Sequence, residues 1–311
     1  MIKPKALAPG DTIGIVAPAG PFDREAFERG AGRLQDLGFQ IRYDREIFQA
    51  DRYMAGKDRF RADQIHRYFS DPEINAIFCA RGGYGSLRLI KHLKPRIIRA
   101  NPKIFVGYSD ITTLLLYFQQ RCSLVTFHGP MVVSDLGKEE VFLEPQDHLM
   151  RLLSSPLPVG ALPDDGIKVI RGGQASGPLT GGCLTLIALS IGTPFEIQTQ
   201  DSILFMEDVG EAPYRIDRLL TYLKLTGKFR GVKGLVFGQM KGCDPDEGSP
   251  YKLSAVIADV LRGIRVPILY NVPSGHGERN WAIPLGVQAT VDGDRGRLIL
   301  EEGAVRQESK V

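Results

Sequence analysis

The chain has 311 residues, of which 43% are hydrophobic and 24% are charged. This length and composition are typical of a folded globular protein with one large domain or two ordinary ones, and they exclude a disordered chain. The formal net charge is +3, from 39 basic and 36 acidic residues interspersed along the sequence. Because the basic residues form no cluster, nothing indicates a nucleic-acid-binding surface.

Cysteine spacing and the apolar runs indicate the compartment. The four cysteines lie far apart without a Cys-x-x-Cys pair, which is typical of reduced thiols in a protein core: Cys79, Cys122, Cys183 and Cys243. Near the amino terminus a proline and an acid precede any apolar run that could serve as a signal sequence. No run of about 18 apolar residues could span a membrane. We therefore expect a cytoplasmic protein that acts on neither membranes nor nucleic acids.

The first half of the sequence alternates strand and helix patterns. Apolar runs predict strands at 12–17, 39–43, 76–80 and 103–106, and amphipathic or densely apolar stretches predict helices at 23–37, 59–70, 87–92 and 109–118. Such repeated βα units favour an α/β fold with a doubly wound, mostly parallel sheet. Functional loops then lie at the carboxyl ends of the strands.

The second half has a different character. Residues 154–166 are rich in turn formers and lack a consistent period, so we place a domain boundary there. Beyond it, short strands are predicted at 167–171, 202–206, 234–238 and 289–292, with one clear helix at 213–224. The sequence thus predicts an α/β domain over residues 1–160 and a smaller β-rich domain over 167–311.

Ser109 stands between a predicted strand and a predicted helix. A Ser-Asp pair is a good helix cap, which alone would explain Ser109 and Asp110. The alternative is a nucleophile on a sharp strand-to-helix turn, with the backbone N–H of Asp110 facing a developing oxyanion. Gly107 is present, but Ile111 replaces the last glycine of the Gly-x-Ser-x-Gly pattern. The motif by itself leaves both interpretations open.

A glycine-rich segment, Arg-Gly-Gly-Tyr-Gly at 81–85, follows the predicted strand 76–80. It does not match the Gly-x-Gly-x-x-Gly pattern of dinucleotide-binding proteins. Its bare backbone could cradle a phosphate, or the N–H of Gly83 could be a second oxyanion donor. A plain tight turn is the third interpretation.

A carboxylate and a histidine that could serve Ser109 lie in the second half. Glu207 follows the predicted strand 202–206, although its neighbouring acids would also suit a solvated turn or a metal site. His276 lies between two glycines in a polar segment, where a surface loop would also explain it. A serine hydroxyl needs a base and a group that orients the base, and His276 and Glu207 could fill these roles. The histidine spacing fits no metal-binding pattern, so we expect no metal.

Taken together, these motifs resemble the LD-carboxypeptidase family of serine peptidases, which includes cytoplasmic muramoyl-tetrapeptide carboxypeptidases and microcin C immunity peptidases. The resemblance covers nearly the whole chain. It rests on several motifs in the same order, at 80–85, 106–110, 177–182, 207–217, 275–277 and 284–286. The resemblance implies a catalytic triad of Ser109, Glu207 and His276.

The resemblance also implies the reaction. The substrate would be a small peptidoglycan peptide, a muropeptide, whose terminal D-alanine is released by hydrolysis of an L,D-amide bond through an acyl-enzyme. The backbone of Gly83 and Asp110 would form the oxyanion hole, and Arg81 is a candidate for binding the terminal carboxylate. No cofactor is required. A homodimer is expected from the resemblance alone.

Other functions remain open. A microcin C-type immunity peptidase cleaving an aminoacyl or peptidyl nucleotide is the nearest alternative, although such relatives carry an aromatic residue in a longer loop before the glutamate, and the only tryptophan here is Trp281. A nucleotide-binding oxidoreductase and a non-catalytic ligand-binding module are more remote, and neither needs a triad. Glu211 could support the site, but we expect it to cap the predicted helix 213–224.

Overall fold

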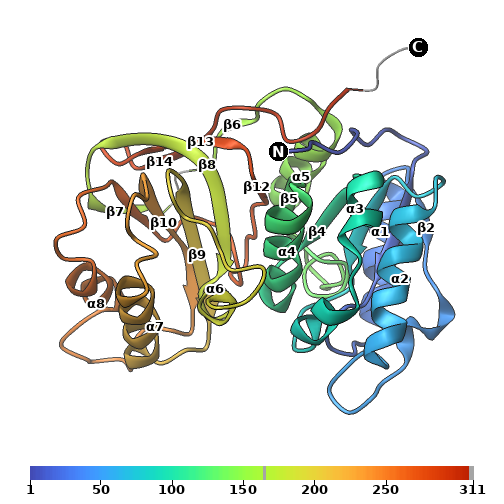
Figure 1. The fold of residues 1–311 in the computed structure, drawn as a ribbon, viewed down its shortest axis with the longest axis horizontal. Coiled ribbons are helices and arrows are strands. Elements are labelled where there is room, and N and C mark those ends of the chain that lie inside the picture. Colours follow the sequence, from blue (N-terminus) through green and yellow to red (C-terminus); the bar gives the residue numbers. More distant parts are fainter. Residues whose placement is uncertain (164–165, 308–311) are drawn as a thin grey trace.

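The computed structural model describes residues 1–163 and 166–307. Two β-sheets lie side by side, the first built mainly from the amino-terminal half and the second from the carboxyl-terminal half (Figure 1). Helices pack against both. The structure confirms the predicted α/β fold with a mainly parallel first sheet and a second sheet in the carboxyl-terminal part.

The first sheet has the strand order β12-β5-β4-β3-β1-β2. Its strands are β1 (Thr12–Val16), β2 (Gln40–Arg42), β3 (Ala76–Cys79), β4 (Ile104–Gly107), β5 (Thr126–His128) and β12 (Ile283–Leu285). All neighbours are parallel except β12, which runs antiparallel to β5. β1, β3 and β4 are buried along their whole length, because unbroken apolar runs can be covered on both faces.

Helices and short 3-10 turns connect these strands. They are α1 (Arg24–Asp36), η1 (Arg45–Phe48), α2 (Asp58–Ser70), η2 (Ser86–His92), α3 (Pro95–Ala100), η3 (Ser109–Ile111), α4 (Thr112–Cys122) and α5 (Leu143–Ser154). Two differ from prediction. Residues 86–92 form a 3-10 helix, and the predicted helix 109–118 starts as a 3-10 turn before α4 begins at Thr112.

The second sheet has the order β6-β14-β13-β8-β9-β10-β11-β7. Its strands are β6 (Gly160–Ala161), β7 (Lys168–Arg171), β8 (Gln174–Cys183), β9 (Ile203–Val209), β10 (Gly234–Lys241), β11 (Ile268–Tyr270), β13 (Gln288–Asp292) and β14 (Arg297–Leu300), and its helices are α6 (Leu184–Ser190), α7 (Pro213–Leu225) and α8 (Leu253–Val260). The central pairs β8-β9, β9-β10 and β10-β11 are parallel. Their carboxyl ends therefore meet at one edge.

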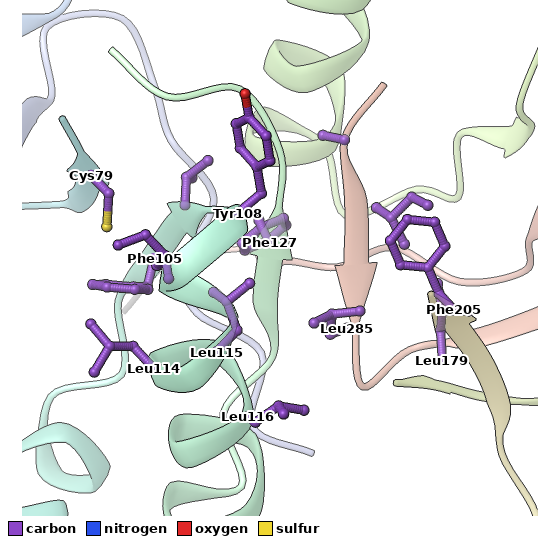
Figure 2. Close-up of a cluster of buried hydrophobic side chains, with 14 of the residues drawn as sticks. Cys79, Phe105, Tyr108, Leu114, Leu115, Leu116, Phe127, Leu179, Phe205 and Leu285 are labelled. Atoms are coloured by element: carbon purple, nitrogen blue, oxygen red, sulfur yellow. The ribbon is translucent and has the colours of Figure 1, made fainter. Parts of the chain in front are cut away.

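The two sheets share a hydrophobic region. Figure 2 shows Leu285 of β12 between two groups of apolar side chains. Phe127 of β5 lies on one side of it, and Leu179 of β8 and Phe205 of β9 lie on the other. β12 comes from the carboxyl-terminal half but completes the first sheet. The domain division at 160 and 167 stays a prediction, and residues 164–165 of the predicted boundary and 308–311 lie outside the described residues.

Candidate active site

Ser109 stands just beyond the carboxyl end of β4, in a strained backbone conformation. Its φ is +63°, in the left-handed region that residues with a side chain rarely adopt. Of the two interpretations left open for Ser109, helix capping does not hold, because the cap position before the 3-10 turn is Tyr108. The strained turn instead holds the hydroxyl out from the strand end, as a nucleophile elbow does.

Asp110 ties this turn to the glycine-rich loop. Its carboxylate, which is 4% exposed, accepts a 2.8 Å hydrogen bond from the backbone N–H of Ser86. The Ser86 hydroxyl in turn donates to the backbone carbonyl of Asp110 at 2.5 Å. Burial raises the pKa of Asp110 above its usual value, although the bonds from Ser86 oppose that shift.

The glycine-rich loop lies directly against the serine. A Cβ built on Gly82 would lie 2.8 Å from the Ser109 Cβ and 2.9 Å from its Oγ. Gly83 follows with a φ of +106°. Arg81 is partly buried and donates from Nη1 to the carbonyl of Pro21 at 2.9 Å. The oxyanion role of Gly83 and Asp110 and the carboxylate-binding role of Arg81 remain predictions.

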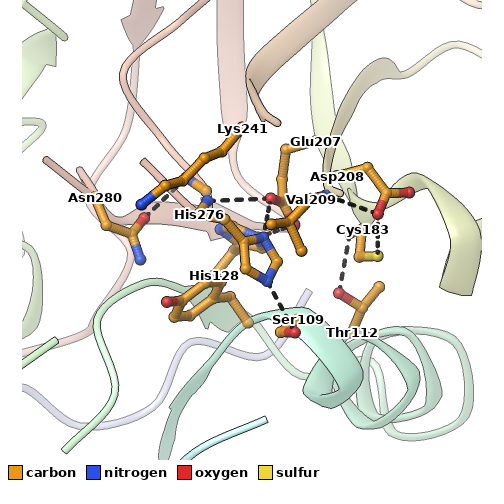
Figure 3. A network of polar contacts seen from close by, with 12 residues as sticks. Ser109, Thr112, His128, Cys183, Glu207, Asp208, Val209, Lys241, His276 and Asn280 are labelled. Carbon is orange, nitrogen blue, oxygen red and sulfur yellow. Dashed lines mark hydrogen bonds and ion pairs between the residues drawn. The ribbon is translucent and has the colours of Figure 1, made fainter. Parts of the chain in front are cut away.

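The serine, the histidine and the glutamate meet across the two sheets. His276, in the loop after β11, places Nε2 at 2.9 Å from Ser109 Oγ and Nδ1 at 2.6 Å from Glu207 Oε2 (Figure 3). Glu207, in β9, is fully buried, whereas the side chain of His276 is 14% exposed. In this arrangement Nδ1–H donates to the carboxylate, so Nε2 is free to accept the serine proton.

Glycine is required beside the histidine. Gly275 has a φ of +115°, and a Cβ there would lie 2.5 Å from Glu207 Oε2. Its N–H donates to Asn280 Oδ1 at 3.0 Å, and the N–H of His276 donates to Glu207 Oε2 at 3.3 Å. The loop is therefore fastened to the same carboxylate as the imidazole.

The electrostatic environment of Glu207 and His276 favours the charged form of the Glu207 carboxylate. Burial by itself favours the protonated acid, but the nearby imidazoles of His128 and His276 outweigh it and lower the pKa of Glu207 to about 2. Burial also opposes a charged His276, yet the hydrogen bond and charge of Glu207 raise the pKa of His276 above its usual value. The charges of Asp208 and Asp135 act in the same direction.

The other acids that follow Glu207 point elsewhere. The carboxylate of Asp208 accepts hydrogen bonds from the backbone N–H and the hydroxyl of Thr185, at 2.9 and 2.8 Å. Glu211 pairs with Arg215 at 3.4 Å, and the cap position of α7 is Ala212 without a side-chain bond, so the expected capping role of Glu211 is wrong. Within residues 1–163 and 166–307, no group of three or more His, Cys, Asp or Glu side chains could hold a metal ion.

His128 belongs to the site but is absent from the sequence-based prediction. It is the last residue of β5, fully buried, with Nε2 at 3.5 Å from Glu207 Oε1. The strand that carries it was not predicted either. A usable signal existed in the sequence: a histidine ends the apolar stretch 124–128 and a Gly-Pro pair follows, which marks a strand end.

A cavity of about 350 Å³ opens next to the loop that carries His276. Glu278 and Asn280 of that loop line it, together with Lys241 at the end of β10 and Asp135. Figure 3 shows Lys241 and Asn280 on the side of His276 away from Asp208. The cavity thus offers both acidic and basic groups to a ligand.

Comparison with known proteins identifies the family. Residues 13–129 match the LD-carboxypeptidase N-terminal domain, and residues 176–291 match the LD-carboxypeptidase C-terminal domain. The chain belongs to the LD-carboxypeptidase family. A probable murein peptide carboxypeptidase of Bacillus subtilis is 35% identical over 302 residues, which cover 97% of this chain and 95% of the relative.

Solved structures agree with this assignment. The muramoyltetrapeptide carboxypeptidase from Oxalobacter formigenes has a TM-score of 0.85 and 27% identity, covering 96% of this chain and 100% of its own. The microcin C7 self-immunity protein MccF in complex with aspartyl sulfamoyl adenosine has a TM-score of 0.91 and 25% identity, covering 98% and 100%. The relatives named as carboxypeptidases support a peptidase of the carboxypeptidase type. No helix in the described part of the chain is long and apolar enough to cross a membrane.

Proposed function

We propose that the protein is a serine carboxypeptidase that releases terminal D-alanine from peptidoglycan tetrapeptides during murein recycling in the cytoplasm. One observation carries the proposal: the unbroken series of contacts from Ser109 Oγ through His276 to Glu207, at 2.9 and 2.6 Å. A buried carboxylate, an oriented imidazole and a strained serine in hydrogen-bond reach are what acyl transfer to a hydroxyl requires.

The mechanism follows from the roles of these atoms. His276 Nε2 takes the proton of Ser109 while Oγ attacks the carbonyl carbon of the L,D-amide bond. The same nitrogen then gives that proton to the amine of the departing D-alanine, which leaves an acyl-enzyme. Water, deprotonated by His276, attacks the ester and restores the serine. Glu207 orients the imidazole and stabilises its charged form in both halves.

The negative charge on the carbonyl oxygen needs donors beside Ser109. The backbone N–H groups of Gly83 and Asp110 are proposed for this role because the glycine-rich loop packs on the serine. Loss of one such donor typically lowers the rate about 10²–10³-fold. Arg81, at the start of the loop, is proposed to bind the terminal carboxylate, and the cavity beside His276 is proposed to take part of the peptide.

The test is the release of D-alanine from L-Ala-D-Glu-diaminopimelate-D-Ala, free or attached to muramic acid. The wild-type protein is expected to release it, and Ser109→Ala is expected to release none. Ser254→Ala, in helix α8, is the matched control and should keep full activity. A tetrapeptide with terminal L-alanine should resist cleavage. Release by Ser109→Ala would remove the serine from its proposed role.

The second candidate is cleavage of an aminoacyl or peptidyl nucleotide, which the TM-score of 0.91 to the microcin C7 self-immunity protein favours. Against it, Trp281 is 8% exposed and packs on His148 with ring centres 5.0 Å apart, so little of its ring is open to a nucleobase. Hydrolysis of an aspartyl sulfamoyl adenosine but not of the tetrapeptide would reverse the ranking.

The proposed homodimer has a simple test. Light scattering after gel filtration should give about twice the chain mass of 34.3 kDa. A mass equal to one chain would overturn the proposal.

A further inference from the structure

The carboxylate of Glu207 uses its two oxygens differently. Oε2 accepts hydrogen bonds from Nδ1 and from the backbone N–H of His276. Oε1 faces Nε2 of His128 at 3.5 Å, and both side chains are fully buried. Among the described residues, neither Oε1 nor either ring nitrogen of His128 makes a hydrogen bond, so the 3.5 Å approach is the closest polar contact between the two side chains.

The imidazole of His128 is held in place from several sides. In the first sheet its residue pairs with Gly107 of β4 and Ile283 of β12. Its ring packs against Tyr108 and Phe205, with ring centres 5.7 and 5.0 Å apart. This packing leaves the ring little freedom to turn away. The ring therefore presents Nε2 to Glu207 as a fixed feature of the interface between the sheets.

The proton on Nε2 follows from this geometry. An unprotonated Nε2 would direct a lone pair at a carboxylate oxygen, and the two would repel each other because both side chains are fully buried. A buried carboxylate oxygen that lacks a donor also bears the full cost of its lost hydration. Both effects favour the form in which Nε2 carries the proton and donates it to Oε1.

We propose that His128 is a positioning residue of the proposed triad, donating from Nε2 to Glu207 Oε1 so that Oε2 stays directed at His276. The inference deepens the proposed function and rests on it for its kinetic consequence. The first sheet then contributes both the nucleophile, Ser109, and the group that fixes the carboxylate. The second sheet contributes the carboxylate itself.

The effect of His128 reaches the serine only through Glu207 and His276. The other titratable groups around them include Tyr108 after β4, Asp135 after β5, Cys183 of β8 and Asp208 of β9. Tyr108 donates to Asp135 and Cys183 donates to Asp208, and none of the four makes a hydrogen bond to Oε1. A donor to Oε1 draws negative charge from the carboxylate. Its removal leaves more charge for the imidazolium of His276, so the pKa of His276 should rise and its orientation should loosen.

The experiment compares His128→Phe, which fills the space without a donor, with His128→Gln, which retains an N–H. His92→Gln is the control outside the site. With ¹⁵N-labelled histidine, all five histidines can be assigned from single variants. The nitrogen spectra of the free protein show which ring nitrogen of His128 carries the proton and at what pH His276 titrates. Neither readout needs a substrate.

We expect Nε2 of His128 to be protonated and Nδ1 not in the wild type. In His128→Phe, His276 should titrate at higher pH, and kcat for D-alanine release should fall about tenfold or more at saturating substrate. In His128→Gln, the titration of His276 and the kcat should both return most of the way to their wild-type values. A proton on Nδ1 instead, or equal titration of His276 in all variants, would overturn the proposal even if the enzyme proves active on another substrate. If His128→Phe does not fold, the proposal is still tested by the protonated ring nitrogen of His128 in the wild-type spectrum and by the titration of His276 in His128→Gln.

Discussion

At the scale of single residues, the proposed role of His276 as the base predicts that its proton affinity sets the working pH. Burial favours the neutral imidazole, but the hydrogen bond and charge of Glu207 prevail and raise its pKa above the usual 6.5. The base must be neutral to accept the proton of Ser109. Activity is therefore lost as the pH falls below the pKa of His276 in the free enzyme. The acid limb of kcat/KM is expected to have its midpoint above pH 6.5, measured by D-alanine release across pH 5–9.

Glu207→Gln tests the cause of that shift. The amide cannot stabilise the imidazolium, so the pKa of His276 should fall and the acid limb should move to lower pH. The rate should also drop about 10⁴-fold, because an amide can hold the wrong tautomer of the base. If the acid limb of kcat/KM stays at the same pH in Glu207→Gln, the pairing of Glu207 with His276 is contradicted.

Gly82 sets the position of the nucleophile. In Gly82→Ala the new Cβ would meet Ser109 at 2.8–2.9 Å, so either the loop or the serine must shift. A displacement near 1 Å costs about a hundredfold in rate, and we expect such a loss in kcat with the far-UV circular dichroism unchanged. Full activity in Gly82→Ala would show that the loop tolerates a side chain beside the serine.

At the scale of elements, helix α1 gives a matched pair of glycines. Asp23 caps the amino end of the helix, and its Oδ1 accepts from the N–H of Ala26 at 2.8 Å. A Cβ on Gly30 would lie 2.0 Å from the carbonyl oxygen of Val132, whereas a Cβ on Gly32 would meet nothing within 4 Å. Gly30 is thus one point where the backbone of the helix closely approaches the segment after β5.

Substitution of these two glycines should act in opposite directions. Gly30→Ala should lower the free energy of unfolding by about 3 kcal/mol, because backbone atoms must move apart. Gly32→Ala should raise it by about 0.5–1 kcal/mol, because alanine restricts the unfolded chain and favours helix. Urea unfolding of both variants measures the difference. Equal effects would contradict the close packing of α1 on this segment.

At the scale of the whole molecule, Glu207 links folding to pH. Its pKa falls from 4.5 to about 2 in the folded state, as the nearby imidazoles of the two histidines overcome burial. A group with a lowered folded pKa stabilises the protein above its unfolded pKa, and that contribution is lost as the pH falls from 4.5 toward 2. The full contribution is about 3 kcal/mol.

The contribution of Glu207 to the free energy of unfolding can be measured by urea unfolding of the wild type and of Glu207→Gln at pH 5 and at pH 3.5. The buried Asp110 and Asp135 have raised pKa values from burial and are present in both proteins, so their effects cancel in the comparison. The charge of Glu207 helps to raise the pKa of Asp208, so loss of that charge in the variant also lowers the pKa of Asp208. The wild type should lose more stability between the two pH values than the variant does. Equal losses would mean that Glu207 has an ordinary pKa.

Much of the fold is local enough to be predicted from the sequence. The strands β3 and β4 are short unbroken apolar runs, and α1 combines a capping aspartate with helical spacing, so each pattern points to one structure. β8 was missed because its segment, residues 174–183, contains three glycines and a proline. A Cβ on Gly181 would lie 1.8 Å from the carbonyl oxygen of Phe205, so the neighbouring strand, and not β propensity, requires glycine there.

The sequence alone determined the kinds of residue at the site, because a serine, a glutamate and a histidine stand in recognisable motifs. Only the tertiary structure decided how they meet: Ser109 and His276 are 167 positions apart and come from different sheets. The left-handed turn at Ser109, the tie between Asp110 and Ser86 and the contact of His128 with Glu207 likewise arise where separate segments pack together. Periodicity and motif spacing report on neighbours along the chain, whereas burial and hydrogen bonding between distant segments exist only once both sheets have assembled.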